Sequence, residues 1–250
     1  MGLFSKFFKK KEEFPPADLG VLACDMHSHF IPGIDDGAKN MEDSLNLLRQ
    51  MQDLGYKKVV TTPHVMSDGY RNTPGIILDG LEKVRAAAKE AGITLEIDAA
   101  AEYYFDFDLQ AKVKTEKLLT FGNKYLLFEV SYMNAPDGLE SFIFDLQTNG
   151  YKPILAHPER YPFWYEDNFA KYEKLKDKGV LFQMNINSLT GYYSISTKRI
   201  AEQMIDRGMI EFLGTDCHHQ GHVNLMQQVR KEKYLHKLLE SGKLLNNTLL

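Results

Sequence analysis

The stretch Asp25-Met26-His27-Ser28-His29 follows an apolar segment, Leu19 to Cys24, whose composition predicts a short buried strand. His27 and His29 are two residues apart, so an extended backbone directs both imidazoles to the same side. Such a pair can chelate one metal ion. Since His-x-His pairs also occur on ordinary surfaces and in cores, the rest of the chain has to decide between a ligand pair and two structural histidines.

Six later apolar segments predict further strands, and helical periodicity lies between most of them. The predicted strands span residues 58–62, 93–101, 125–128, 153–156, 180–184 and 210–214. The predicted helices span residues 41–54, 76–91, 139–147, 166–178, 196–207 and 223–240. Strands that alternate with helices indicate a parallel sheet with crossover connections. We therefore predict an α/β fold, a (β/α)7 TIM-like barrel one unit short of the usual eight.

Composition agrees with a single folded domain, which we assign to residues 19–250. Of the 250 residues, 44% are apolar and 26% are charged, as in ordinary globular proteins. The net charge of −4 gives no reason to expect nucleic-acid binding. Cys24 and Cys217 form no C-x-x-C pair, so they predict no disulfide framework and favour a reducing cytoplasm.

Residues 1–18 are predicted to be a flexible basic and aromatic tail that ends near Pro15-Pro16. Its phenylalanines and lysines leave one alternative open. Residues 3–11 would then form a short basic amphipathic helix that contacts the anionic inner face of a membrane. The segment is too short and too rich in lysine for a signal peptide or a membrane span.

Residues of metal-ligand type follow the predicted strands. They are His27, His29, Asp36, His64, Glu102, Glu129, His157, Asp216 and His218. Each has an ordinary explanation when it is taken alone; His157, for example, could cap the next helix. In a closed barrel, however, all the carboxyl ends of the strands converge on one mouth, where so many ligand-type side chains are improbable without a function.

The number and chemistry of these side chains predict two or three divalent ions that share bridging carboxylates. Imidazole and carboxylate ligands without sulfur suit Mn²⁺, Fe²⁺ or Zn²⁺. Such ions generate hydroxide near neutral pH and neutralise the oxygens of a phosphoryl group. Arg160 could hold phosphate oxygens with its planar guanidinium, although a surface ion pair with Glu159 is equally compatible with the sequence.

Other hydrolase chemistries lack their motifs. A cysteine-dependent phosphatase needs Cys-x5-Arg, but the sixth residue after Cys24 is Phe30 and the sixth after Cys217 is Val223. The sequence also contains no G-x-x-x-x-G-K-[ST] loop and no G-x-S-x-G elbow. Hydrolysis through a cysteinyl phosphate is therefore not expected.

Taken together, six motifs resemble the PHP (polymerase and histidinol phosphatase) superfamily. They are Asp25-Met-His-Ser-His29, Pro32-Gly-Ile-Asp-Asp-Gly37, Thr62-Pro-His64, Ala101-Glu102, Ala156-His-Pro-Glu-Arg160 and Thr215-Asp-Cys-His218. More closely, the chain looks like the bacterial metal-dependent protein-tyrosine phosphatases of capsule and exopolysaccharide operons. The resemblance covers about residues 22–222 and implies a distorted (β/α)7 barrel with three metal ions, most often manganese.

The resemblance also implies a role for each ligand-type residue. One ion would be held by His27, His29, Glu102 and Asp216, a second by Glu102, Glu129 and His157, and a third by Asp36, His64 and His218. Arg160 matches the phosphate-binding arginine and would act in catalysis with Glu102 and Asp216. Members of the family can carry a second arginine after the Asp-x-His motif. Here the next arginine is Arg230, so His219, His222 or no residue takes that place.

By this resemblance the substrate is phosphotyrosine on a tyrosine autokinase that controls polysaccharide export. A histidinol-phosphate phosphatase or a nuclease of the same superfamily is one alternative. The motif Pro32-Gly-Ile-Asp-Asp-Gly37 favours the tyrosine phosphatase, and the acidic balance disfavours a nuclease.

The other alternative is a non-catalytic docking partner of the kinase with structural metals. Arg160 and the complete ligand set disfavour it, because structural sites rarely keep open coordination positions. The sequence leaves the oligomeric state undetermined.

Overall fold

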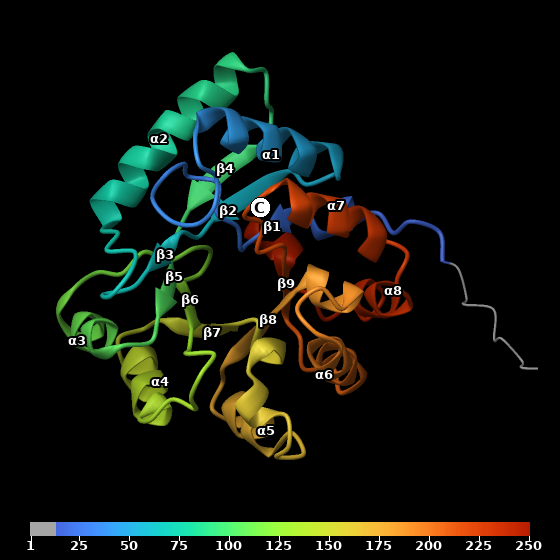
Figure 1. Ribbon diagram of the computed structural model, residues 1–250. Coiled ribbons are helices and arrows are strands. Elements are labelled where there is room, and N and C mark those ends of the chain that lie inside the picture. The colour runs from blue at the N-terminus through green and yellow to red at the C-terminus, as the bar shows by residue number, and fades with distance from the viewer. Residues whose placement is uncertain (1–13) are drawn as a thin grey trace, which may run out of the picture.

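The computed structural model describes residues 14–250; residues 1–13, which include the segment 3–11 considered for membrane contact, lie outside the described residues. Within the described part the strands are β1 (Cys24–Asp25), β2 (Lys58–Thr61), β3 (His64–Val65), β4 (Glu96–Ala99), β5 (Glu102–Tyr104), β6 (Tyr125–Glu129), β7 (Lys152–Ala156), β8 (Leu181–Asn185) and β9 (Phe212–Gly214). They lie in the middle of the molecule with the helices around them (Figure 1).

All paired strands are parallel, and they form a sheet β1-β2-β4 and a sheet β3-β5-β6-β7-β8-β9. The chain passes from β2 to β3 and from β4 to β5 over breaks of only two residues. Pro63, which has no N–H to give to a ladder, lies in the first break. The strands therefore follow the seven lines that the sequence predicts, with the third predicted strand, 93–101, shortened and interrupted.

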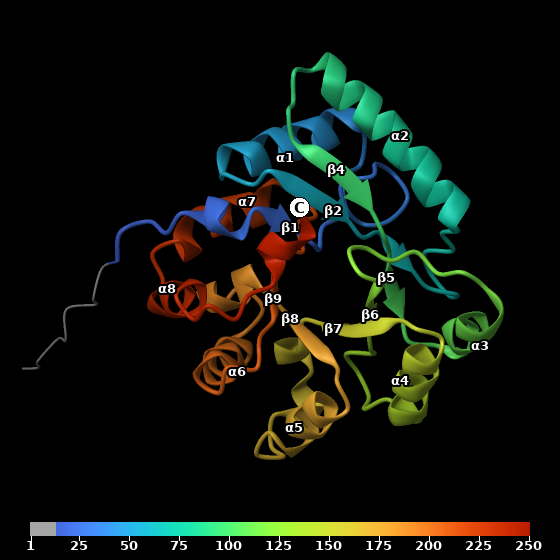
Figure 2. The ribbon, with the colours of Figure 1, turned by 180° about the vertical axis from the view of Figure 1, so that it is seen from behind.

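Backbone hydrogen bonds join the two ends of this arrangement. His29 N donates to Cys217 O at 3.0 Å, and Asp216 N donates to His27 O at 2.8 Å. Views from opposite sides both place β9 beside β1 (Figures 1 and 2). The strand lines thus return to their start, which agrees with the predicted distorted (β/α)7 barrel.

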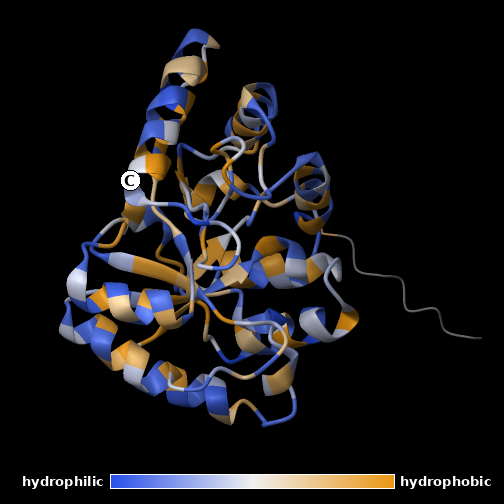
Figure 3. Ribbon diagram, turned by 60° about the vertical axis from the view of Figure 1, so that its left-hand side comes forward, coloured by the Kyte–Doolittle hydropathy of each residue, from blue (hydrophilic) through white to orange (hydrophobic). Residues whose placement is uncertain are grey.

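The helices are α1 (Met41–Asp53), α2 (Pro74–Glu90), α3 (Phe107–Thr115), α4 (Leu139–Thr148), α5 (Ala170–Asp177), α6 (Ile195–Asp206), α7 (Gln220–Val229) and α8 (Lys233–Leu239). Asn40, Thr73, Asp106 and Ser194 begin four of them, because each side chain accepts a hydrogen bond from a backbone N–H of the first turn. Hydrophobic and hydrophilic residues alternate along the helices, as expected where one face packs on a core (Figure 3).

The predicted strand Leu19 to Cys24 is wrong over most of its length. Leu19–Leu22 form the 3₁₀ helix η1, and only Cys24–Asp25 pair as β1. The Asp18 carboxylate accepts a hydrogen bond from Gly20 N at 2.8 Å and begins this turn. Leu19 and Leu22 are buried at a spacing of three residues, which suits a 3₁₀ helix, whereas Val21 is exposed.

The predicted helix 223–240 is also wrong, because the chain breaks between α7 and α8. Ala17 N donates to the Arg230 carbonyl at 2.8 Å, and Arg230 Nε donates to the Ala17 carbonyl at 2.7 Å. This exchange between the two ends of the chain draws the Arg230 carbonyl out of the helical ladder. Sequence periodicity does not show such a long-range contact.

Two other differences concern helices with weak patterns. Helix α3 was not predicted. Its buried residues are Leu109 and Val113, and two apolar positions are too few to define a helical period in the sequence. Helix α5 begins at Ala170 rather than at residue 166, because Asn168 and Phe169 have positive φ angles of 53° and 71°.

Two apolar clusters fill the fold. The larger lies between strands and helices and includes Leu126 and Phe128 of β6. The smaller includes Leu127, which points to the opposite face of the same strand, together with Met26 and Phe212. Residues of one strand that alternate between two clusters show that the barrel has its own packed interior beneath the mouth.

Both terminal segments of the described chain pack on the rest of the fold. The Phe14 ring lies 5.1 Å from the His236 ring of α8, and the 3₁₀ helix η5 (Asn246–Leu249) packs under the barrel. Within residues 14–250 no helix has the length and apolar character needed to cross a bilayer. The proposed boundary at residue 19 remains a prediction.

Candidate metal centre and active site

The ligand-type residues lie at the carboxyl ends of the strands, as predicted for the mouth of a barrel. Glu102 follows the carboxyl end of β4 and is the first residue of β5, which continues the same strand line; Glu129 ends β6 and His157 follows β7. His27 and His29 follow β1, and the other four predicted ligands are Asp36, His64, Asp216 and His218. Parallel pairing aligns these ends, and the structure brings all nine side chains together.

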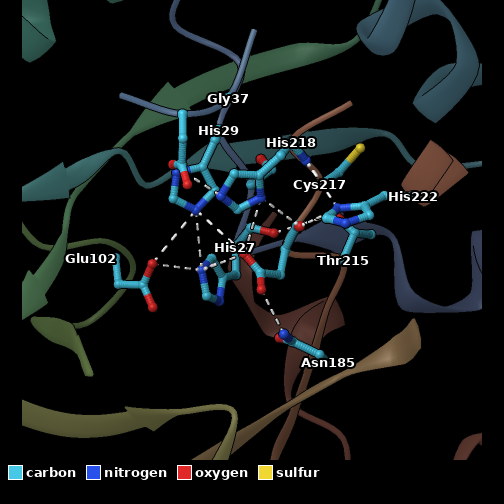
Figure 4. A network of polar contacts seen from close by, with 12 residues as sticks. His27, His29, Gly37, Glu102, Asn185, Thr215, Cys217, His218 and His222 are labelled. Carbon is cyan, nitrogen blue, oxygen red and sulfur yellow. Dashed lines mark hydrogen bonds and ion pairs between the residues drawn. The ribbon is translucent and has the colours of Figure 1, made fainter. Parts of the chain in front are cut away.

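Glu102 is at the centre of this cluster and is completely buried. Its Oε2 atom lies 3.1 Å from His27 Nε2, 3.5 Å from His29 Nε2 and 3.2 Å from His64 Nδ1. Its Oε1 atom lies 2.9 Å from His157 Nε2. Figure 4 shows His27 and His29 facing Glu102. A carboxylate with imidazoles around both oxygens has the geometry of a bridging ligand.

The ligand atoms gather into three overlapping groups, each within 4.8 Å. The groups are His27, His29, Glu102 and Asp216; His29, Asp36, His64 and His218; and His64, Glu102 and Glu129. The first coincides with one ligand set implied by the resemblance, and the second adds His29 to another. His157 joins none of the three, although its Nε2 lies 4.0 Å from Glu129 Oε2 as well as beside Glu102.

The charges of the cluster fit divalent cations. Burial disfavours the charged form of His27, but Glu102 and Asp216 outweigh burial and raise the pKa of His27 to about 9. Burial would raise the pKa of Glu102, yet His27 and His64 hold it well below its usual range. The carboxylates thus require positive charge beside them. Protonated imidazoles can supply it, and metal ions supply it when they replace the imidazole protons.

The position of His64 supports the same conclusion. Its Nδ1 atom is buried and has no hydrogen-bond partner among the described residues. Nevertheless it lies 3.1 Å from Glu129 Oε1 and 3.2 Å from Glu102 Oε2. Atoms this close without hydrogen-bond geometry are expected where all of them face a shared cation.

Two of the predicted ligands have strained backbones. His157 has a φ of 34° and Asp216 a φ of 48°, in the left-handed region that few residues other than glycine adopt. Strain of this kind persists only where the surroundings enforce it, and it is common at functional sites. At each position it turns the side chain from the end of a strand into the mouth.

Asp35 is a residue that the sequence analysis missed. Its Oδ2 atom lies 2.7 Å from His29 Nδ1, and its Oδ1 atom accepts a hydrogen bond from Gly37 N at 3.0 Å. The side chain is buried, whereas that of its neighbour Asp36 is 53% exposed. The doublet Asp35-Asp36 was a visible signal, but the sequence does not show that the two carboxylates have different tasks.

Gln183 and Asn185 of β8 hold further ligands in place. Gln183 Oε1 lies 2.8 Å from His27 Nδ1, and Gln183 Nε2 donates to Asn185 Oδ1 at 2.9 Å. Asn185 Nδ2 in turn donates to Asp216 Oδ2 at 2.6 Å (Figure 4). This chain of buried amides fixes His27 and Asp216 from behind, leaving His27 Nε2 directed to the cluster.

Arg160 lies at the mouth rather than in a surface ion pair with Glu159. Its guanidinium carbon is 4.7 Å from the centre of the Tyr132 ring and 4.1 Å from that of Tyr193. One of its nitrogens donates to Asp216 Oδ2 at 3.3 Å. Glu159 is instead buried, where its Oε1 atom accepts hydrogen bonds from β8 and η4 (Ile186–Thr190). Two aromatic rings thus hold the cation beside the ligand cluster.

A cavity of about 500 Å³ opens above these residues. Its lining includes seven of the nine predicted ligands and Arg160, and its walls include Tyr70, Tyr132, Tyr192 and Tyr193. His219 and His222 line it as well. Burial lowers the pKa of His222 to about 4, and its Nδ1 atom lies 3.0 Å from the Asp216 carbonyl oxygen.

Fold and site together define a barrel protein whose mouth carries a cluster of residues that could hold divalent metal ions. The chain belongs to the capsular polysaccharide synthesis family CpsB/CapC, whose model matches residues 23–240. This result agrees with the family that the sequence motifs indicate.

Named relatives and solved structures support this assignment. The tyrosine-protein phosphatase YwqE of Bacillus subtilis is 28% identical over 195 residues, which are 78% of this chain and 76% of that protein. The tyrosine-protein phosphatase CpsB of Streptococcus pneumoniae is 27% identical over 201 residues, 78% of this chain and 82% of that protein. A solved structure reported for these two as metal-dependent tyrosine phosphatases matches with a TM-score of 0.79 and 26% identity, covering 90% of each chain.

A more distant likeness concerns the fold alone. A phosphotriesterase homology protein from Escherichia coli matches with a TM-score of 0.50 and 14% identity, over 92% of this chain and 93% of that chain. The core arrangement of strands and helices is therefore shared beyond the family.

Proposed function

We propose that the chain is a metal-dependent phosphomonoesterase that hydrolyses phosphotyrosine on proteins. The observation that carries this proposal is the placement of the Arg160 guanidinium beside the ligand cluster, at the edge of one cavity with tyrosine walls. The names of the relatives, which are tyrosine-protein phosphatases, support the same activity.

We further propose that the cluster binds three divalent ions, with manganese favoured over iron or zinc. The nitrogen and oxygen donors, without sulfur, suit these metals. When bound, such ions activate water near neutral pH and neutralise charge on phosphoryl oxygens. The ligand sets are those implied by the resemblance, with His29 as an additional candidate beside Asp36, His64 and His218.

The chain's own residues then bind and orient the substrate. Arg160 offers parallel N–H groups to phosphate oxygens, and the rings of Tyr132 and Tyr193 keep its side chain from turning away. Because Asp216 also holds Arg160, the arginine stays beside the ligand cluster. An aromatic leaving group fits the tyrosine-lined walls. A phenolate also leaves readily, so a dedicated general acid is less necessary.

The proposed protein substrate is a membrane-associated tyrosine autokinase of polysaccharide export, reached from the cytoplasm. The family's description in capsular polysaccharide synthesis supports this setting. Contact of residues 3–11 with the inner face of the membrane is part of the same hypothesis.

The test compares the turnover of a phosphotyrosine peptide, histidinol phosphate and an oligonucleotide with added Mn²⁺. We expect the peptide to be hydrolysed with the highest kcat/KM. A preference for histidinol phosphate or for the oligonucleotide would assign a different phosphoesterase activity. No turnover of any of them by metal-loaded protein would favour the docking partner.

A further inference from the structure

A second cavity adjoins the first behind Arg160. It has a volume of about 470 Å³ and shares Tyr132, Arg160 and Tyr193 with the cavity above the ligand cluster. The arginine and its two aromatic neighbours therefore form a partition that is accessible from both sides. A group that reaches the cluster past Arg160 has this second cavity beside it.

A third cavity, of about 400 Å³, continues in the same direction and shares Tyr165 with the second. Ser196 lines the second cavity, and Arg199 and Gln203 line the third. Spacings of three and four residues place these side chains on one face of α6. The second and third cavities thus follow one another along α6, which lies beside α5 in Figure 1. We call the two cavities together the α6 trough.

The charges along the α6 trough leave one cation without a partner. Asp206 accepts a hydrogen bond from Lys237 Nζ at 2.6 Å, and Arg207 donates to Glu173 Oε1 at 3.0 Å. Arg160 is engaged with Asp216. The Arg199 side chain is exposed, and within the described residues it forms no ion pair or hydrogen bond. The trough therefore offers an uncompensated positive charge.

We propose that the α6 trough binds the peptide segment next to the phosphotyrosine and that Arg199 pairs with an acidic side chain of that segment. This inference rests on the proposed function and adds a substrate class to it, phosphotyrosine with a nearby acidic residue. An extended peptide is the occupant because the two cavities follow one another along α6 and the first of them adjoins the catalytic cavity at Arg160.

The dimensions locate the acidic residue. The lining face of α6 from Ser196 to Asp206 covers about 15 Å at a rise of about 1.5 Å per residue. An extended peptide advances about 3.3 Å per residue, so the trough holds about four residues. Since Arg199 lies one turn from Ser196, we expect the acidic side chain about two or three residues from the phosphotyrosine.

The first test measures kcat/KM for phosphotyrosine peptides in which one glutamate is moved through positions on both sides of the phosphotyrosine. An otherwise identical neutral peptide is the reference. We expect one position to be preferred about fivefold, and Arg199→Glu to remove or reverse that preference. Arg49→Glu, which reverses another exposed arginine in the middle of a helix away from the trough, should keep it. The absence of any preference in the unaltered protein, or a preference unaffected by Arg199→Glu, would overturn the proposal.

The second test fills the trough with bulk. Ser196→Trp should raise KM for the peptide about fivefold or more, while the exposed neighbour substitution Ile195→Trp should not, because Ile195 does not line the cavities. Equal effects of the two substitutions would exclude a peptide in the trough.

Turnover of free phosphotyrosine by the unaltered protein separates failure of the trough proposal from failure of the proposed function. If the protein hydrolyses free phosphotyrosine and the phosphotyrosine peptides with the same kcat/KM, the trough proposal fails but the proposed function stands. If neither substrate is hydrolysed, the proposed function fails.

Discussion

Asp35 and His29 form a buried pair in which the Oδ2 atom of the carboxylate lies 2.7 Å from the Nδ1 atom of the imidazole. The other nitrogen of the ring, Nε2, faces Glu102 and Asp216 at 3.5 Å each. A carboxylate behind a metal-binding imidazole fixes the tautomer and makes the ring a better ligand. Asp35 thus has a supporting role that differs from that of its exposed neighbour Asp36.

The corresponding substitution is Asp35→Asn. Loss of the negative charge behind His29 should weaken metal binding by about 10- to 100-fold. Titration of metal-free protein with Mn²⁺, followed by calorimetry, measures the change. Asp53→Asn, at an exposed position, is the control and should bind metal normally. Unchanged affinity in Asp35→Asn would show that His29 does not depend on this contact.

Removing Glu102 should cost more metal than removing Asp36. Glu102 is buried and belongs to two of the three ligand groups, whereas Asp36 is half exposed and belongs to one. A bridging carboxylate provides the charge that lets two cations lie close together. Elemental analysis of Glu102→Ala and Asp36→Ala should therefore find a larger deficit per chain in the first. Equal deficits would mean that the ions bind independently. Glu102→Gln keeps the side-chain volume and controls for collapse of the site.

Arg160→Ala should lower kcat/KM by about 100-fold while metal content stays unchanged, because the phosphoryl oxygens lose a charged bidentate donor. Arg160→Lys should recover little, since an ammonium group cannot stack between Tyr132 and Tyr193 as the planar guanidinium does. Steady-state kinetics and metal analysis of the same preparations provide the measurement. Normal turnover in Arg160→Ala would remove the arginine from the mechanism.

Activity should depend on metal and not on thiols. A chelator should abolish turnover, and added Mn²⁺ should restore it. Iodoacetamide should have no effect under native conditions, because Cys24 and Cys217 are both buried and burial raises the pKa of each thiol. Full activity after chelation, or inactivation by alkylation of folded protein, would contradict the proposed chemistry.

Asn246 should be important for stability. Its Nδ2 atom donates to the carbonyl oxygens of Cys24 at 2.9 Å and Leu213 at 2.7 Å, and its Oδ1 atom accepts from Leu213 N at 3.0 Å. The side chain thus links β1 to β9, where the barrel closes. Asn246→Ala leaves these buried groups without partners and should lower the free energy of unfolding by about 3 kcal/mol.

Urea unfolding at a fixed metal concentration tests this expectation, since bound metal itself adds stability. Asn247→Ala is the matched control, because Asn247 is exposed, and it should change the free energy of unfolding by less than about 0.5 kcal/mol. Similar values for the two variants would mean that the closure does not depend on Asn246.

Local sequence determined the strands and helices with strong patterns, and through them the class of fold. The segments around β6, β7 and β8 were predicted within one residue at each end, because apolar residues predominate in them and turn residues bound them. Helix α1 was predicted equally well from the spacing of Met41, Leu48 and Met51. Where the local pattern was weak, as in α3, or was overruled by a distant contact, as at Arg230, the prediction was wrong.

The sequence by itself also determined which types of residue stand at the strand ends, and therefore the chemistry available at the mouth. Only the tertiary structure decided which of these residues contact one another and which are buried. It placed Glu102 among four imidazoles, gave Asp35 rather than Asp36 the buried position, and set Arg160 between two tyrosine rings. The physical reason is that ligand type depends on the residue alone, whereas distances, burial and shared contacts arise from strands that are far apart in the chain and meet only when the barrel closes.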